Sequence, residues 1–195
     1  MITSLYLKML NREAAAPKMM SGEIIKHLRI QKGQVVADIG SGGGYFTSEF
    51  ARKVGETGTV YAVDAQLKNL NFIRRQAEQE RLENIVFVPA VANTVDLPDA
   101  CLDLMFVRNA FHHLPQPMQY FRNLKRLLKK NGKVAIIEHK PKGGCSHVAL
   151  FKHYTPVTVI VREMAEAGYK VVQSFDFLPA QTFTVFGVSK FNKKE

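Results

Sequence analysis

Predicted β-strands and α-helices alternate along this chain, and this alternation restricts the fold more than any other feature. Apolar runs at 35–39, 59–63, 84–89, 102–107 and 134–138 predict buried strands. The segments around them place apolar residues at helical spacing, as in Phe46, Phe50 and Val54. Such alternation indicates a parallel sheet with helices on both faces.

Further helices are expected at 21–28, from 67 to about 82, and after Pro117. The helix after Pro117 has Tyr120, Phe121, Leu124, Leu127 and Leu128 on its core face, and Asn131-Gly132 is expected to end it. In the last helix, Thr155 is expected as the N-cap before Pro156 at the first helical position, with Gly168 at the end.

The last two predicted strands, 171–177 and 182–188, are separated by only a few residues. So short a link suits an antiparallel hairpin and cannot contain a parallel crossover. Because no repeat or Pro/Gly/Ser-rich linker divides the chain, we expect one domain over 1–195. It has an N-terminal helical part of about 1–30 and a core of about 31–195.

Composition narrows the class of protein further. With 46% hydrophobic and 23% charged residues, the chain is typical of a soluble globular domain. Cys101 and Cys145 stand far apart, which argues against a disulfide framework or a metal site and indicates a reducing cytoplasm. No apolar run approaches the roughly 20 residues of a membrane span, and residues 1–11 lack the features of a signal peptide. We therefore expect a cytoplasmic protein without a membrane span; the sequence does not indicate an oligomeric state.

The net charge is +10, and its densest groups lie at 125–133 and 190–194. Lysines near the C-terminus of a helix suit the helix dipole, so the charge does not require a special partner. A net positive charge also suits nucleic-acid binding, which stays open as a less favoured alternative.

The strongest local signal is a glycine-rich loop between the first strand and the next helix, with the sequence Asp38-Ile39-Gly40-Ser41-Gly42-Gly43-Gly44. Glycines there allow a tight turn and a close approach of the backbone to a ligand. The loop lies at the carboxyl edge of the predicted sheet, where open α/β folds bind ligands.

The spacing of residues within the loop can be compared with the motifs that bind two common kinds of ligand. A dinucleotide fingerprint beginning at Gly40 and Gly42 would require glycine or alanine where Tyr45 stands. A phosphate-binding P-loop would require Gly-Lys-Ser/Thr at its end, and no lysine is present there. The pattern is D-x-G-x-G-x-G.

This pattern resembles motif I of the class I S-adenosylmethionine-dependent methyltransferases. The resemblance runs from about residue 21 to 190 and includes Leu97-Pro98, Leu102-Asp103-Leu104 and Phe111-His112-His113-Leu114. The last of these is similar to the branch that contains the ubiquinone/menaquinone-biosynthesis methyltransferases. The resemblance implies a Rossmann-like α/β three-layer sandwich, whose mostly parallel seven-stranded sheet has an antiparallel final strand.

The resemblance also implies S-adenosylmethionine as cofactor and suggests where it binds. Asp64, at the end of the second strand, corresponds to the family's acidic residue on the ribose hydroxyls, because a carboxylate accepts two O–H groups. As a strand-end residue, Asp64 is expected to be replaceable without loss of the fold. The family's acidic adenine contact is missing at Ala90-Val91-Ala92-Asn93; the Asn93 side chain and the backbone near Val91 and Ala92 both stay open for this role. The full set of implied cofactor-binding residues is Asp38, Gly40, Ser41, Gly42, Gly44, Asp64, Ala65, Ala92, Asn93, Arg108 and Asn109.

Methyl transfer from a sulfonium is an in-line displacement that needs alignment and at most a base for the acceptor proton. His112 and His113 follow the fourth strand and Glu138 ends the fifth, at the same edge as the glycine loop. They are the candidate catalytic residues. Each also has a structural reading, as a histidine bonded to loop backbone or as an ion-paired carboxylate.

The favoured interpretation is a methyltransferase that acts on a small molecule whose identity the sequence does not give. Three alternatives remain. An RNA methyltransferase would show salt-dependent RNA binding, a non-catalytic S-adenosylmethionine-binding module would show no turnover, and a nicotinamide-dependent oxidoreductase is disfavoured by Tyr45.

Overall fold

The computed structural model describes residues 2–91, 94–140 and 154–189. Seven strands form one sheet: β1 (Val35–Ile39), β2 (Thr59–Asp64), β3 (Ile85–Pro89), β4 (Leu102–Arg108), β5 (Leu128–His139), β6 (Tyr169–Phe175) and β7 (Gln181–Val188). Their order is β3-β2-β1-β4-β5-β7-β6. β7 pairs antiparallel with both β5 and β6, while the strands from β3 to β5 pair in parallel. The predicted mostly parallel sheet with an antiparallel final strand is confirmed.

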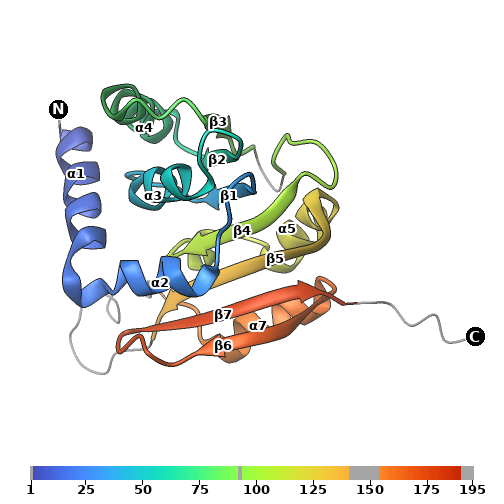
Figure 1. The fold of residues 1–195 in the computed structure, drawn as a ribbon. Helices are drawn as coiled ribbons and strands as arrows, with labels where there is room; N and C mark the ends of the chain where they lie inside the picture. Colours follow the sequence, from blue (N-terminus) through green and yellow to red (C-terminus); the bar gives the residue numbers. More distant parts are fainter. Residues whose placement is uncertain (1, 92–93, 141–153, 190–195) are drawn as a thin grey trace, which may run out of the picture.

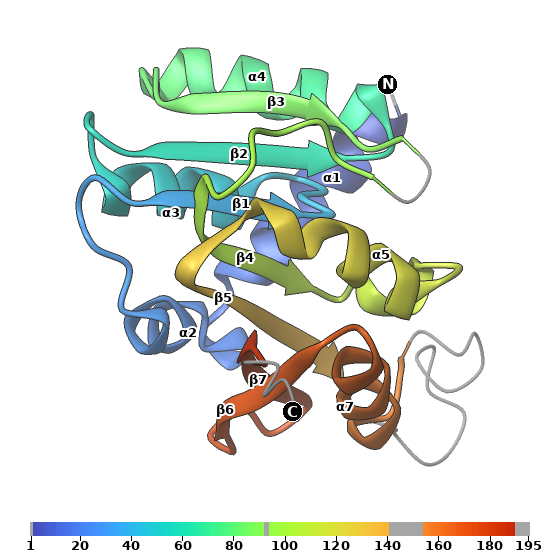
Figure 2. The same ribbon diagram turned by 90° about the vertical axis from the view of Figure 1, so that its right-hand side faces the viewer.

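Helices cover both faces of this sheet (Figures 1 and 2). They are α1 (Ile2–Ala15), α2 (Ser21–Leu28), α3 (Tyr45–Val54), α4 (Leu67–Glu80), α5 (Pro117–Leu124) and α7 (Val157–Glu166), with 3-10 turns η1 (Pro17–Met19), η2 (Phe111–His113) and η3 (Lys125–Leu127). α2, α3 and α4 pack on one face, and α5 and α7 on the other. The molecule is thus a three-layer sandwich.

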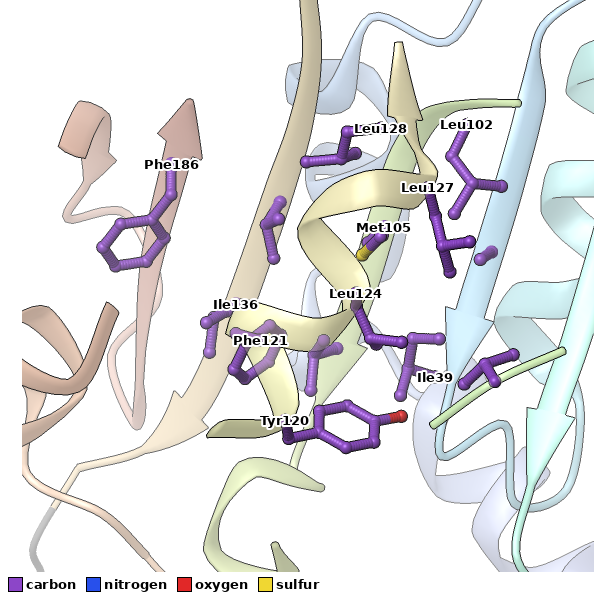
Figure 3. Packing of buried hydrophobic residues seen from close by; sticks show 14 of the residues in the cluster. Ile39, Leu102, Met105, Tyr120, Phe121, Leu124, Leu127, Leu128, Ile136 and Phe186 are labelled. Atoms are coloured by element: carbon purple, nitrogen blue, oxygen red, sulfur yellow. The ribbon is translucent and has the colours of Figure 1, made fainter. Parts of the chain in front are cut away.

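Alternation along the strands divides the buried residues between these two layers. In β4, Leu104 and Phe106 face α3 while Met105 and Val107 face α5. Figure 3 shows the second layer, where Phe121 and Leu124 of α5 lie over strand residues that include Ile136. Strands buried on both faces in this way have near-continuous apolar sequences, which is why β1, β4 and β5 were recognisable in the sequence.

One predicted helix end is wrong. Asn131-Gly132 does not end the helix that follows Pro117; this helix stops at Leu124, and after η3 the chain enters β5 at Leu128. Leu128 pairs with Leu102, and a register shift separates this pair from the next, Leu104 with Lys133. A Cβ on Gly132 would lie 2.7 Å from the Leu102 carbonyl oxygen, so this glycine permits close approach of two strands at an irregularity.

Two other local expectations differ in detail. Thr155 is not the N-cap of α7, because Pro156 is the last extended residue (ψ 139°) and the helix begins at Val157 without a side-chain cap. β6 begins at Tyr169 instead of 171, since Gly168 (φ +92°) turns the chain directly from α7 into the strand. The hairpin that follows is antiparallel as predicted.

Candidate functional site

The glycine loop leaves β1 and enters α3 through three residues with positive φ: Gly40 (+74°), Gly42 (+54°) and Gly44 (+83°). A Cβ on Gly40 would lie 2.6 Å from the Ala110 Cβ, and one on Gly44 would lie 2.7 Å from the Ile73 side chain. At Gly42 the nearest atom would be 3.8 Å away. Gly40 and Gly44 are therefore required by packing as well as by φ, whereas a Cβ on Gly42 would make only ordinary van der Waals contacts.

Asp64 lies beside this loop at the end of β2 and is buried. Its Oδ2 accepts a hydrogen bond from the Gly42 backbone N–H at 2.9 Å. Its Oδ1 accepts bonds from the Gln66 backbone N–H at 2.8 Å and from Asn69 Nδ2 at 3.1 Å. The carboxylate thus joins the first loop, β2 and the start of α4, which brings two predicted residues together at one point.

Asp38, at the end of β1, is buried below the loop. Its Oδ2 accepts a bond from the Thr47 hydroxyl at 2.6 Å. Burial raises the pKa of Asp38 to about 7, helped by the nearby Asp64 charge and opposed by the Thr47 bond. Ser41 is also buried; its hydroxyl donates to the Val63 carbonyl at 3.4 Å. Both side chains therefore serve the shape of the loop.

Arg108 ends β4 at the same edge, and its guanidinium lies 5.0 Å from the centre of the Phe46 ring. Burial lowers the pKa of Arg108 to about 10, while the charges of Glu13, Tyr45 and Asp38 oppose the shift. Among the described residues its buried Nε has no hydrogen-bond partner. A buried donor without a partner is expensive, which marks this guanidinium as a ligand-contact candidate.

Gln181, the first residue of β7, was not predicted as a site residue. Its Oε1 accepts a bond from Arg108 Nη2 at 3.0 Å, and its Nε2 donates to Asn109 Oδ1 at 2.6 Å. Asn109 itself has a positive φ of +52°. Gln181 therefore fixes both predicted residues that follow β4, and a lone glutamine at a strand start gives no sequence signal of this role.

The predicted catalytic residues meet at the ends of β4 and β5. Glu138 is 0% exposed, and its Oε2 accepts a bond from His112 Nδ1 at 3.0 Å. The His113 residue is exposed, and its ring centre lies 4.1 Å from that of His112. Glu138 is thus a hydrogen-bond partner of His112, and the structure brings all three residues together.

Helix α1 lies beside α3 and α4 (Figure 1) and contacts the glycine loop. Asn11 Nδ2 donates to the Gly43 carbonyl at 2.7 Å and to Gln76 Oε1 at 3.1 Å. A Cβ on Gly43 would lie 2.2 Å from Asn11 Oδ1. The sequence did not predict this contact between the N-terminal helix and the glycine loop, because the weak apolar pattern of the helix does not show which loop it packs on.

The remaining predicted residues are less informative. Ala65 is exposed next to Asp64, and Ala92 and Asn93 lie outside the described residues. Two hollows of about 530 and 430 Å³ occur at the opposite edge of the sheet. Both are lined by Arg29 among other residues, and neither contains a predicted site residue. The candidate site is therefore defined by the contacts at the carboxyl edge.

A search of known families matches residues 30–180 to a family described as a methyltransferase domain. The chain belongs to the class I S-adenosylmethionine-dependent methyltransferases. A curated relative of this methyltransferase, the demethylmenaquinone methyltransferase of Geobacillus sp. (strain WCH70), is 25% identical over 116 residues, covering 60% of this chain and 50% of the relative. The ubiquinone/menaquinone biosynthesis C-methyltransferase UbiE of Escherichia fergusonii is 28% identical over 110 residues, covering 56% and 44%. The methyltransferase thus aligns with about half the length of the curated relatives it matches.

Solved structures support the fold of this methyltransferase. A SAM-dependent methyltransferase from Aquifex aeolicus superposes with a TM-score of 0.83 at 23% identity, covering 94% of this chain and 97% of the other. An S-adenosylmethionine-dependent methyltransferase from Mesorhizobium loti gives a TM-score of 0.69 at 15% identity, covering 85% and 96%.

Two features are absent from the described residues of this chain. No helix there is both long and apolar enough to cross a bilayer. Within the same residues, no group of three or more His, Cys, Asp or Glu side chains could hold a metal ion.

Proposed function

We propose that this chain transfers the methyl group of S-adenosylmethionine to a small-molecule acceptor at the carboxyl edge of its sheet. The observation that carries the proposal is the contact between Asp64 and Gly42 in a D-x-G-x-G-x-G loop. It joins an acidic strand end to a glycine backbone with positive φ angles, in a chain of this family.

The donor residues follow from this placement. The backbone of Gly40, Ser41, Gly42 and Gly44 would line the donor, and Asp64 would accept the ribose hydroxyls. Since both Asp64 oxygens already accept hydrogen bonds, the ribose would share or replace the Gly42 and Asn69 donors.

Other predicted contacts are proposed on weaker grounds. Ala65 lies next to Asp64. Ala92 and Asn93, which follow β3 in the sequence, are proposed as adenine contacts from the family resemblance alone. Asp38, Arg108 and Asn109 would surround the amino-acid end of the donor. The buried Nε–H of Arg108 suits the donor carboxylate, because a guanidinium binds carboxylates well.

The acceptor side is formed by the segment after β4 and the end of β5. The relatives act in quinone biosynthesis, as their names state, which favours a small organic acceptor over a nucleic acid. The donor sulfonium supplies the activated methyl group; the chain would hold the acceptor in line with it and exclude water. We also propose a cytoplasmic location, on the basis of two distant cysteines.

Calorimetric titration with S-adenosylmethionine, S-adenosylhomocysteine and NAD tests the donor site. We expect binding of the first two and far weaker binding of NAD; equal or tighter binding of NAD would refute the proposal. Incubation of methyl-labelled donor with fractionated metabolites then tests turnover. Label in a small product supports the enzyme, label in RNA supports the alternative acceptor, and binding without turnover indicates a regulatory module.

A further inference from the structure

The carboxylate of Glu138 is the most enclosed acidic group of the acceptor side. It is 0% exposed at the end of β5, and three N–H groups surround it. Its Oε2 accepts bonds from the His112 backbone N–H at 3.3 Å and from His112 Nδ1 at 3.0 Å. Its Oε1 accepts a bond from the His139 backbone N–H at 2.9 Å. A buried carboxylate needs such compensation, and here most of it comes from one residue.

This arrangement determines the tautomer of His112. An ionised carboxylate can only accept hydrogen bonds, so the bond to Glu138 requires the proton of the neutral ring to be on Nδ1. Nε2 then has the lone pair and can accept a proton. A carboxylate that holds a histidine in one tautomer is a common way of preparing a base.

The location of this pair is next to the proposed donor loop. Ala110, two residues before His112, is the side chain that a Cβ on Gly40 would touch at 2.6 Å. On the other side, Thr182 Oγ1 of β7 donates to the Glu138 backbone carbonyl at 3.3 Å. The His112 side chain is 7% exposed, so the ring is held by surrounding structure instead of moving freely in solvent.

The two neighbouring histidines lack this arrangement. His139 contacts Glu138 through its backbone N–H, and burial lowers the pKa of its half-buried ring. The exposed His113 lies with its ring against the ring of His112. His112 combines a side chain held by its surroundings with a hydrogen bond to a buried carboxylate.

We propose that His112 is the base that removes a proton from the methyl acceptor, and that Glu138 is the positioning residue that holds His112 in the required tautomer. This inference rests on the proposed function. For a hydroxyl acceptor, Nε2 takes the O–H proton as the oxygen attacks the methyl carbon. The new O–C bond forms while the C–S bond breaks, and its electron pair neutralises the sulfonium to give S-adenosylhomocysteine. The proton then leaves His112 for water.

The proposal specifies the class of acceptor. An acceptor that must lose a proton to become nucleophilic, such as a hydroxyl compound, benefits from this base. A tertiary amine or a thioether already has a reactive lone pair and has no proton to give. The acceptor is therefore of the first class.

Other charged groups surround the pair. At the neighbouring ring of His139, whose pKa burial lowers, the charges of Glu138 and Glu13 of α1 favour the protonated form, whereas those of Arg108 and His112 disfavour it. His113 in η2 lies against the His112 ring. Glu138 is the member that bonds the His112 ring directly, so its replacement should have the largest effect.

Nitrogen-15 NMR of the histidine rings tests the arrangement without an acceptor, with S-adenosylhomocysteine bound. Wild type should show His112 protonated on Nδ1 at high pH. Glu138→Gln should raise the fraction of His112 rings that have their proton on Nε2. Glu13→Gln, which removes another carboxylate whose charge acts on this edge of the sheet, is the control and should change that fraction less. A proton on Nε2 in wild type, or equal changes in both variants, would overturn the proposal.

Kinetics with the acceptor found by the labelled-donor screen test the chemical role. His112→Asn should lower kcat by roughly 10²–10⁴-fold with unchanged donor Kd, and Glu138→Gln should move the acidic limb of the kcat profile to lower pH. Full activity of His112→Asn, or a tertiary amine or thioether as the acceptor, would refute the base while leaving the donor site and the methyltransferase assignment intact.

Discussion

Replacing Asp64 with alanine should weaken both the fold and the donor site, and the two effects can be measured separately. The carboxylate accepts three hydrogen bonds, from Gly42 N, Gln66 N and Asn69 Nδ2. Hydrogen bonds to a charged group contribute about 1.5–3 kcal/mol each, but neighbouring bonds are not additive. We expect a loss of about 3 kcal/mol in the free energy of unfolding. This revises the sequence-based expectation that a strand-end residue can be replaced without affecting the fold.

The effect on binding follows from the same residue. Loss of the ribose contact should weaken donor binding by about 1.5–3 kcal/mol, which is roughly a 10- to 150-fold increase in Kd. A ligand at 100 times its Kd stabilises a protein by about 2.7 kcal/mol. At the same ligand concentration, the stabilisation of the Asp64→Ala variant by the ligand should fall to between about 1.3 and 0.3 kcal/mol.

Urea unfolding with and without S-adenosylhomocysteine measures both quantities. Asn69→Ala is the matched control, because it removes one donor to Asp64 and leaves the carboxylate. This control should lose about 1 kcal/mol of stability and keep nearly the full gain from ligand. If Asp64→Ala also keeps the full gain, Asp64 does not hold the ribose, and the placement of the donor across β1 and β2 is wrong.

Three further substitutions test the surroundings of the loop. Gly43→Ala should loosen α1, because its Cβ would lie 2.7 Å from the Leu7 carbonyl oxygen; hydrogen exchange should show faster exchange in α1, and unchanged protection would contradict this packing. Gly42→Val should abolish donor binding in calorimetry and lower stability by about 1–2 kcal/mol through its φ of +54°; a folded variant that still binds would show that the loop does not contact the donor. Burial raises the pKa of Asp38 to about 7, so the protonated side chain contributes to stability below about pH 4, and this contribution is lost as the pH rises through 7. Asp38→Asn should flatten this part of the curve of unfolding free energy against pH. An unchanged curve would argue against a buried, protonated Asp38.

The sequence predicted those parts of the fold that depend on local patterns. The strand pattern from Val35 to Ile39 and the short link before β7 were enough for the parallel core and the antiparallel end. Asn131-Gly132 was misread because a turn-forming pair serves equally well at a helix end and at a strand irregularity. The contact that distinguishes them is with Leu102, about 30 residues earlier.

Part of the arrangement of the candidate site, as distinct from its function, could be predicted from the same kind of local pattern. The glycine loop, Asp64 and the His112-Glu138 pair lie at strand ends, and parallel strands bring such ends to one edge. Asn11 and Gln181 were not predicted, because their roles depend on contacts 32 and 73 residues away in the chain. No local pattern gives the distance between such pairs.

The position of β7 has a consequence for synthesis of the chain. It is the last of the seven strands to be made, yet it lies between β5 and β6, which are made before it. A ribosome adds about 5–20 residues per second, so β6 spends an interval with no strand to pair with. The first residues of β7 bond Arg108 and the Glu138 carbonyl. A nascent chain can thus complete its glycine loop early, but its acceptor side forms only when this last strand is inserted.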